Sequence, residues 1–282
     1  MDALLGREIP VLDHGFIRLI DYMGNDDAIV QAARVSYGRG TKSVSDDRAL
    51  IRYLMRNRHT TPFEMAEIKL HVRLPIFVAR QWIRHRMASV NEYSARYSVL
   101  DREFYVPRGE AIGAQSAVNR QGRGSDFDPA EAELIADIFR SDAERAYDRY
   151  LELLNQDEEG NALSGTRTGV ARELARINLP LSLYTQWYWK IDLHNLLGFL
   201  SLRAHPHAQR EIRAYAEEML KIVAAWVPHT YEAFVDYRRD SYELSRGALE
   251  AVRRMLRGES VAPGDVGLSQ REWRDLVGKH PA

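Results

Sequence analysis

The clearest hydrophobic pattern in the chain is a strict alternation in segment 66–75, AEIKLHVRLP. Every second residue from Ile68 to Leu74 is apolar, and the residues between are charged or histidine. Because successive side chains of a strand point to opposite faces, this period of two predicts a half-buried β-strand. Segment 181–193, LSLYTQWYWKIDL, is rich in aromatic residues and predicts a buried strand. Segment 10–24 predicts one or two short strands that close on a glycine turn.

Most of the remaining pattern is helical. The segment from Asp26 to Tyr37 predicts a helix with Asn25 as its N-cap, and the apolar stripe of segment 46–58 predicts a second helix. Pro75 sits at a position that favours the start of a helix, which is predicted to run through Arg80. Further helices are predicted over 129–154, 167–180, 192–202 and 206–226.

Two segments interrupt this pattern. Segment 109–128 is polar and glycine-rich, which predicts a mobile surface excursion. The residues after about Arg239 are charged and helical, with a break at VAPGD, and are expected to form an appendage over 241–282 whose role the sequence does not assign. The pattern as a whole predicts an α/β or α+β domain over 1–240, with few strands and many helices.

Composition excludes several classes of function. The 282 residues are 45% hydrophobic and carry a formal net charge of -1, which is ordinary for a soluble globular protein and argues against a general nucleic-acid binder. The chain has no cysteine, so a disulfide framework, a thiolate metal site and a cysteine nucleophile are excluded. No apolar run suits a membrane span or a signal peptide, and a cytoplasmic location is expected. His194, His205 and His207 lack the spacing of a metal site, so no metal is predicted.

One segment concentrates candidate chemistry: residues 80–98, RQWIRHRMASVNEYSARYS. Its arginines could be the solvated face of a helix, since Arg80 and Arg84 are one helical turn apart. However, the cations lie among apolar residues such as Trp82, and a buried arginine requires an anionic partner. Glu92 is the only acid in the segment, so either the fold supplies acids from elsewhere or a ligand supplies phosphate or carboxylate groups.

The same segment resembles the signature of the flavin-dependent thymidylate synthases, RHR-x7-S, in which Arg84, His85 and Arg86 are followed by Ser94. Ten positions of fixed spacing are similar to the family pattern. Further similar stretches follow in the family's order and extend the resemblance over about residues 8 to 240: RHTTPFE, PIFVARQW, ARINLPLSLYTQWYW, DLHNLL and SLRAHPHAQREI.

The resemblance implies a reaction, its cofactors and an assembly. Family members methylate dUMP to dTMP, with 5,10-methylenetetrahydrofolate as carbon donor and FAD, reduced by NADPH, as hydride source. They are homotetramers with shared active sites and an α+β fold, in which a small antiparallel sheet packs with several long helices. Two phosphate-bearing ligands converging on one segment would account for its many arginines.

The resemblance also assigns roles by position. Arg203 is implied as the catalytic residue, since a guanidinium beside the pyrimidine N3 and carbonyl stabilises negative charge on the ring; the alternative is an arginine that stabilises a helix C-terminus. The dUMP-binding residues implied are Gln81, Arg84, Glu92, Ser94, Arg96, Arg176 and Arg203. The FAD-binding residues implied are His59, Thr61, Arg84, His85, Arg86, Glu92, Asp192, His194 and Gly198.

Some positions carry a competing interpretation or depart from the family. Ser94 lacks a recognisable base and is interpreted as a hydrogen-bond donor rather than a nucleophile. Thr61 could be a helix cap before Pro62. Gly198 stands where relatives carry a polar residue, and Thr60 stands where they often carry an acidic one.

Three alternative functions remain open from the sequence. The first is a nucleotide-binding module of the same fold without catalysis. The second is an RNA- or DNA-binding protein that stacks bases on Trp82, Tyr93 and Tyr97. The third is a flavin reductase that oxidises NADPH without methyl transfer.

Overall fold

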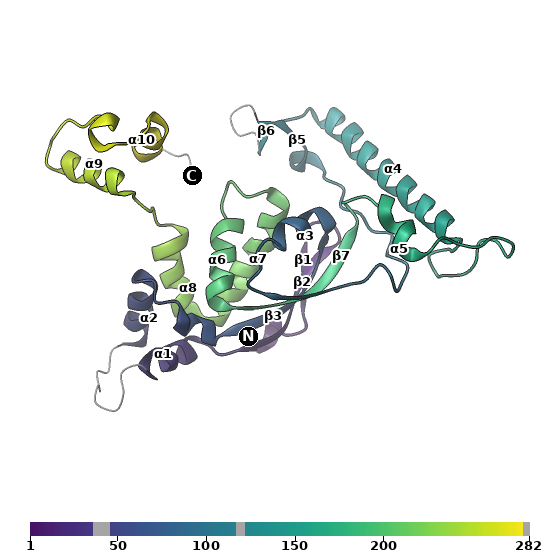
Figure 1. Cartoon of the computed structure of the whole chain (residues 1–282), viewed down its shortest axis with the longest axis horizontal. Coiled ribbons are helices and arrows are strands. Elements are labelled where there is room, and N and C mark those ends of the chain that lie inside the picture. Colours follow the sequence, from purple (N-terminus) through teal and green to yellow (C-terminus); the bar gives the residue numbers. More distant parts are fainter. Residues whose placement is uncertain (36–45, 117–121, 279–282) are drawn as a thin grey trace. The chain divides into compact units, whose positions relative to one another are not determined.

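A computed structural model describes residues 1–35, 46–116 and 122–278, and the chain forms two compact units, Met1–Phe234 and Val235–Ala282. The first unit is built on a five-stranded antiparallel sheet in the order β1-β2-β3-β7-β4 (Figure 1). The predicted alternating strand and the predicted aromatic strand are neighbours at its centre, with Leu70 opposite Trp189. The strands are β1 (Glu8–Val11), β2 (Gly15–Met23), β3 (Glu67–Pro75), β4 (Ser89–Glu92) and β7 (Tyr184–Asp192).

One face of this sheet carries the main core. Trp82, from helix α3 (Ile76–Trp82), is 1% exposed and packs edge-on against Trp189 of β7, with ring centroids 5.2 Å apart. Phe199 of α6 (Leu193–Arg203) lies 4.8 Å from the same indole, and Tyr215 of α7 (Arg210–Trp226) lies 5.9 Å from it. The buried tryptophan therefore anchors the end of α3, directly before the arginine-rich residues.

The helices follow the sequence pattern where an amphipathic stripe is long. Asn25 caps α1 (Asp26–Val35) by accepting from the Ala28 N–H at 3.1 Å, as predicted; the last residues of that predicted helix, 36 and 37, lie outside the described part. α2 (Asp47–Arg56) and α4 (Pro129–Leu154) also match, and α8 (Pro228–Phe234) ends the unit.

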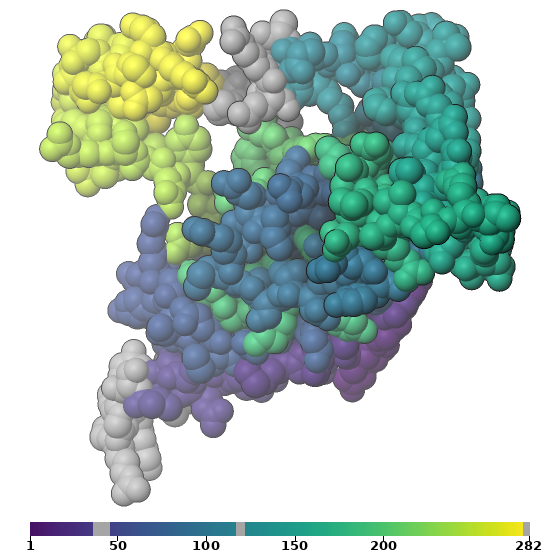
Figure 2. Space-filling model, turned by 45° about the vertical axis from the view of Figure 1, so that its right-hand side comes forward, coloured from purple at the N-terminus to yellow at the C-terminus, as the bar shows by residue number. Residues whose placement is uncertain are grey.

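The helix predicted over 167–180 is wrong for most of its length. Only α5 (Arg172–Ala175) and the 3-10 turn η5 (Arg176–Asn178) form there. The preceding residues instead bond the end of α4, where the Val170 N–H donates to the Leu153 carbonyl at 2.7 Å. A Cβ on Gly169 would lie 1.9 Å from the Leu154 carbonyl oxygen, so this close approach requires glycine. In Figure 2 the teal surface of α4 adjoins the green surface of this segment.

Two other boundaries differ from the predictions. Helix α7 begins at Arg210 rather than 206, because residues 205–208 form a turn in which the Ala208 N–H donates to His205 O at 2.8 Å. The excursion 109–128 contains the 3-10 turn η4 (Gly109–Ala111) and the antiparallel pair β5 (Gly113–Gln115) and β6 (Arg123–Asp126). Residues 117–121 lie outside the described part, and the mobility of the excursion stays a prediction.

The second unit is small and helical. It begins with the π-helical turn η6 (Val235–Arg239) and contains α9 (Arg246–Leu256), η7 (Pro263–Val266) and α10 (Gln270–Val277). The Tyr242 hydroxyl donates to the Asp275 carbonyl at 3.1 Å and links its two ends. The α+β class with an antiparallel sheet is confirmed by these elements. In the described ranges, no helix combines the length and the apolar character that a membrane crossing requires.

Candidate active site

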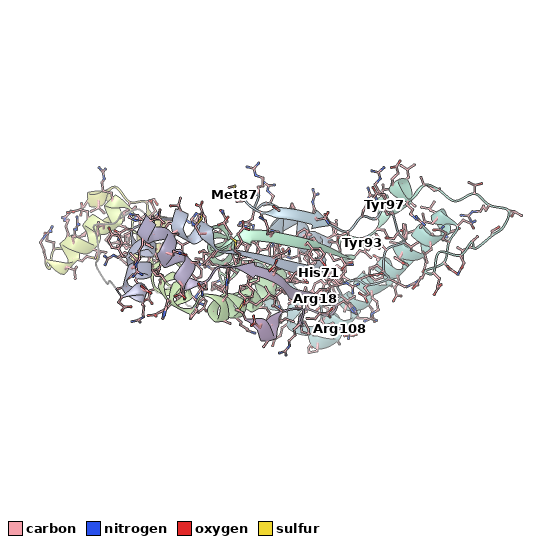
Figure 3. The ribbon with its side chains drawn as sticks, turned by 90° about the horizontal axis from the view of Figure 1, so that it is seen from below. Arg18, His71, Met87, Tyr93, Tyr97 and Arg108 are labelled. Carbon is pink, nitrogen blue, oxygen red and sulfur yellow. The ribbon has the colours of Figure 1, made fainter. Side chains whose placement is uncertain are left out.

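The arginine-rich segment is not a helix face. Helix α3 ends at Trp82, and a turn follows in which the His85 N–H donates to the Trp82 carbonyl at 3.0 Å. The chain then enters β4 at Ser89, where it pairs with β7. Arg80 therefore lies on the helix and Arg84 in the turn, so the single helical face is wrong, although both side chains are exposed as that interpretation expects. The exposed Met87 of this turn is labelled in Figure 3.

The turn brings three predicted site residues together. The Arg203 Nε, at the end of α6, donates to His85 Nε2 over 3.2 Å, and its guanidinium also donates to the Gln81 backbone carbonyl at 3.4 Å. The His85 ring lies edge-on to Phe199 with ring centroids 4.9 Å apart. Residues from two segments more than a hundred positions apart thus form one cluster, at the point where α3 and α6 both end.

The electrostatics of this cluster are unusual. Burial lowers the pKa of Arg203, and no carboxylate in the described part of the chain pairs with it. Burial, and then the neighbouring Arg203 charge, lower the pKa of His85 below its ordinary value of 6.5. His85 is therefore neutral near pH 7, and because Nε2 accepts from Arg203, its proton is on Nδ1. A half-buried guanidinium that bonds only neutral acceptors retains its capacity to bind an anionic or carbonyl-rich ligand.

The loop after β4 carries a second set of predicted residues. Glu92 accepts from the Thr185 hydroxyl at 2.9 Å, and the Ser94 Oγ accepts from the Arg96 N–H at 3.4 Å. Arg96 forms an ion pair of 3.0 Å with Glu173 of α5, so here the fold itself supplies the acid. This pair places the loop against α5, which leads directly into Arg176.

The two sets are not joined within one chain. Across the described ranges, no hydrogen bond or ion pair links the Ser94–Arg96 loop to the Arg203–His85 pair. Tyr93 and Tyr97, which flank Ser94 in the sequence, are labelled on this loop in Figure 3, and Tyr97 is 82% exposed.

Several other residues assigned to flavin lie at or near the start of α6. Asp192 caps this helix by accepting from the Asn195 N–H at 2.9 Å. The Leu193 N–H donates to the Ala66 carbonyl at 2.8 Å and so joins α6 to the end of the 3-10 turn η3 (Thr61–Met65). The His59 ring, before this turn, lies edge-on to Tyr53 at 5.6 Å.

The remaining flavin assignments are Thr61, Gly198 and His194. Thr60 is the residue at the cap position of η3 and makes no capping bond through its side chain, so the interpretation of Thr61 as the cap is wrong. Gly198 is exposed on α6, and a Cβ built on it meets nothing within 4 Å. His194 is half-buried in the first turn of the same helix.

The residues present suit a dinucleotide cofactor. Arg84 and Arg86 are exposed, and within the described residues neither forms an ion pair. The open surface at Gly198 lies on α6, whose last residue, Arg203, contacts the turn that carries these two arginines. Guanidinium groups without an ion pair suit the phosphates of FAD, and an open surface suits its flat ring system.

The histidines after Arg203 are accounted for without a metal. The His207 N–H donates to His205 Nδ1 at 3.2 Å, and the two rings lie 5.0 Å apart. The described residues contain no group of three or more histidine, aspartate or glutamate side chains placed to hold a metal ion.

Comparisons with known proteins decide the family. A profile of the family described as "Thymidylate synthase complementing protein" matches residues 18–229. The flavin-dependent thymidylate synthase of Gluconobacter oxydans is 61% identical over 98% of this chain and 88% of its own. That of Rickettsia bellii is 59% identical over 98% of this chain and 95% of its own. The chain belongs to the flavin-dependent thymidylate synthase family. The family and the class of enzyme predicted from RHR-x7-S are confirmed.

A solved structure agrees with this family in fold. The UMP/dUMP methylase PolB of Streptomyces cacaoi, bound with 5-Br UMP, superposes with a TM-score of 0.68 at 36% identity. The match covers 82% of this chain and 98% of the PolB chain.

The curated relatives change one expectation. The similarity to them covers 98% of this chain, so it includes most of the tail after residue 240, which was expected to lie beyond the shared region.

The structure adds two residues that the sequence assigned no role. Gln209 and Glu211 lie at the start of α7, and the Gln209 side chain bonds both Glu211 and Gln81. The available signal was a carboxylate within an apolar helical stripe: Glu211 is 1% exposed and is followed by the fully buried Ile212 and Tyr215.

Proposed function

We propose that this chain catalyses the reductive methylation of dUMP to dTMP, with 5,10-methylenetetrahydrofolate as carbon donor and NADPH-reduced FAD as hydride source, in dTMP biosynthesis. The observation that carries the proposal is Arg203: a half-buried guanidinium bonded to a neutral histidine, without a carboxylate partner in the described residues, beside the RHR turn. Reduced FAD, when bound, would supply the hydride, and because the chain has no cysteine, a mechanism with a thiolate nucleophile is closed to it.

Each substrate-binding residue has its own role in this proposal. Arg203 holds the pyrimidine at its N3 and carbonyl edge and stabilises the negative charge that makes carbon 5 more nucleophilic. Ser94, Arg96 and Arg176 hold the nucleotide phosphate, with Glu92 and Arg84 beside them, and Gln81 contacts the base. Each charge-assisted hydrogen bond contributes about 1.5–3 kcal/mol, so several together support micromolar binding.

The cofactor residues form the neighbouring part of the proposed site. Arg84, His85 and Arg86 contact FAD together with Glu92, and the start of α6 contributes Asp192, His194 and the Gly198 surface. His59 and Thr61 lie beside the flavin and folate stack. Because the two sets of substrate residues are not linked within the described part of one chain, we assign them to different subunits of a homotetramer. The cytoplasmic location expected from the sequence stays a prediction.

The first test is the visible spectrum of the purified protein during titration with dUMP. A bound-flavin spectrum that shifts saturably with dUMP supports the proposal, because it places both ligands in one site. A protein that remains colourless after incubation with FAD overturns it. NADPH oxidation at a rate indifferent to dUMP would indicate a reductase, and salt-dependent oligonucleotide binding without flavin would indicate the nucleic-acid alternative.

The same titration with UMP tests a second substrate. PolB, 36% identical to this chain, is described as a UMP/dUMP methylase and was solved with 5-Br UMP bound. A spectral shift with UMP at concentrations similar to those of dUMP would extend the proposed substrate to both nucleotides.

A further inference from the structure

A series of hydrogen-bonded side chains runs from a buried carboxylate to Gln81. Glu211 is 1% exposed, and its Oε1 accepts from Arg123 and from the Tyr105 hydroxyl, the latter at 3.0 Å. Its Oε2 accepts from the Gln209 amide nitrogen at 2.8 Å, and the Gln209 amide oxygen in turn accepts from the Gln81 amide nitrogen. Burial and the adjacent Glu211 charge raise the pKa of Tyr105, which keeps its hydroxyl a donor.

The buried carboxylate fixes the direction of both amides. A carboxylate only accepts hydrogen bonds, so Gln209 must present its NH2 group to Glu211 and its oxygen to Gln81. Gln81 must therefore present its NH2 group to Gln209, which leaves its Oε1 and its second N–H for a ligand. Turning Gln209 would bring its amide oxygen against the buried Glu211 carboxylate, which is costly, and turning Gln81 would bring two amide oxygens together.

We propose that Glu211, acting through Gln209, is a positioning residue that sets Gln81 to select uracil over cytosine. The proposal rests on the proposed function, in which Gln81 contacts the base. Uracil carries a donor at N3 beside a carbonyl at C4, which matches an amide that presents Oε1 and one N–H. Arg203, which only donates, then bonds the carbonyl at C2 on the other side of N3. Cytosine carries an acceptor at N3 beside an amino group and requires the opposite amide direction. Arg203 also donates to the backbone carbonyl of Gln81, and this bond holds Gln81 next to the proposed catalytic residue.

The test uses the holoenzyme and compares the dissociation constants of dUMP and dCMP from the change in the flavin spectrum. In Glu211→Gln the new amide oxygen takes the place of Oε1, where Tyr105 and Arg123 donate, and the new NH2 group faces Gln209. Both glutamines then turn, and Gln81 presents an N–H where its Oε1 stood, which is the amide direction that cytosine requires. Glu217→Gln is the matched control, because Glu217 lies on the same helix at the surface and, among the residues that the structure describes, its one ion pair is with Arg213 at 3.3 Å.

We expect the unmodified enzyme and Glu217→Gln to prefer dUMP by at least about tenfold, the value of one mismatched hydrogen bond. Glu211→Gln is expected to reverse or abolish this preference and to raise KM for dUMP more than it lowers kcat. An unchanged ratio in Glu211→Gln, or equal binding of dUMP and dCMP by the unmodified enzyme, overturns the proposal. If the unmodified enzyme binds no dUMP at all, the proposed function fails instead.

A second variant tests the proposal if Glu211→Gln does not fold. Gln209 is exposed, so Gln209→Met interrupts the series without touching the buried carboxylate. It is expected to bring the ratio of the two dissociation constants close to one without reversing it. A ratio like that of the unmodified enzyme would also overturn the proposal.

Discussion

The Arg203 Nε donates to the unprotonated Nε2 of His85 over 3.2 Å, and this bond ties the end of α6 to the turn after α3. The bond requires a neutral histidine, because a protonated ring has no acceptor to offer. It therefore orients the guanidinium without neutralising it, which an aspartate or glutamate at the same place would do. The full charge of Arg203 remains for the substrate.

Arg203→Ala should retain bound flavin and lose most turnover. By analogy with the removal of one donor from an oxyanion site, we expect kcat to fall by about 10²–10³. The measurement is dTMP formation, with the flavin spectrum recorded on the same sample. Arg145→Ala, which removes an exposed cation of α4 paired with Asp142, is the control and should behave as the unmodified enzyme. Near-normal turnover in Arg203→Ala would show that the arginine only stabilises the helix C-terminus.

Acid should weaken dUMP binding through His85. Its pKa is below 6.5, so the acceptor is intact at pH 7 and is lost only as the pH falls further below 6.5. Protonation would place two cations in contact, and Arg203 would then turn away. The same shift affects stability: the unfolded chain takes up the proton at higher pH than the folded one, so the free energy of unfolding falls as the pH decreases from 6.5.

The measurement for His85 is the dissociation constant of dUMP against pH. His85→Gln offers an amide acceptor that does not titrate, so its dissociation constant for dUMP should change little as the pH falls below 6.5. His207→Gln should show the same rise in the dissociation constant as the unmodified enzyme. If dUMP binding to His85→Gln weakens in acid as much as binding to the unmodified enzyme, the titrating group is not His85.

Ser94→Ala should retain measurable turnover with weaker dUMP binding. The Ser94 Oγ accepts from the Arg96 N–H at 3.4 Å, and within the described residues no histidine bonds it as a base would. Loss of one phosphate hydrogen bond is expected to raise KM by about tenfold. Steady-state kinetics separate the cases: complete loss of turnover with dUMP still bound would restore the nucleophile interpretation.

Mixing two inactive variants tests the assignment of residues to subunits. Arg176→Ala and Arg203→Ala each remove one substrate contact, and if a site combines both residues from different subunits, mixed oligomers contain some intact sites. Activity should then reappear when the two variants are unfolded and refolded together, but not when each is refolded alone. No recovery from mixtures that form mixed oligomers would place both residues on one subunit.

The sequence predicts the centre of the sheet because β3 and β7 carry local signals, whereas the edge strand β4 is not predicted. The alternation of 66–75 and the aromatic pattern of 181–193 each describe burial on one face, and β3 and β7 do pair at the centre of the sheet. The helix predicted over 167–180 fails because its start bonds the end of α4, a tertiary contact that helical propensity does not contain.

The candidate site shows the same limit. The RHR-x7-S spacing identifies the segment, but the bond between His85 and Arg203 joins residues 118 positions apart. Glu211 could be noticed only as an acid in an apolar stripe, and its link to Gln81 requires the turn before α7. Charge and spacing therefore predict which residues act, whereas the direction of each hydrogen bond follows from the fold.

Gly198 and Gly15 should respond oppositely to alanine. A Cβ on Gly198 meets nothing within 4 Å, so alanine should stabilise α6 by about 1 kcal/mol, the difference in helix propensity. A Cβ on Gly15 would lie 2.0 Å from the Tyr215 hydroxyl and 2.6 Å from the Val11 carbonyl oxygen, so alanine there must displace β1 or α7. Thermal unfolding should show a higher Tm for Gly198→Ala and a lower Tm for Gly15→Ala. A lower Tm for Gly198→Ala would mean that this surface is covered in the assembled protein, and FAD titration would then show whether the cofactor covers it.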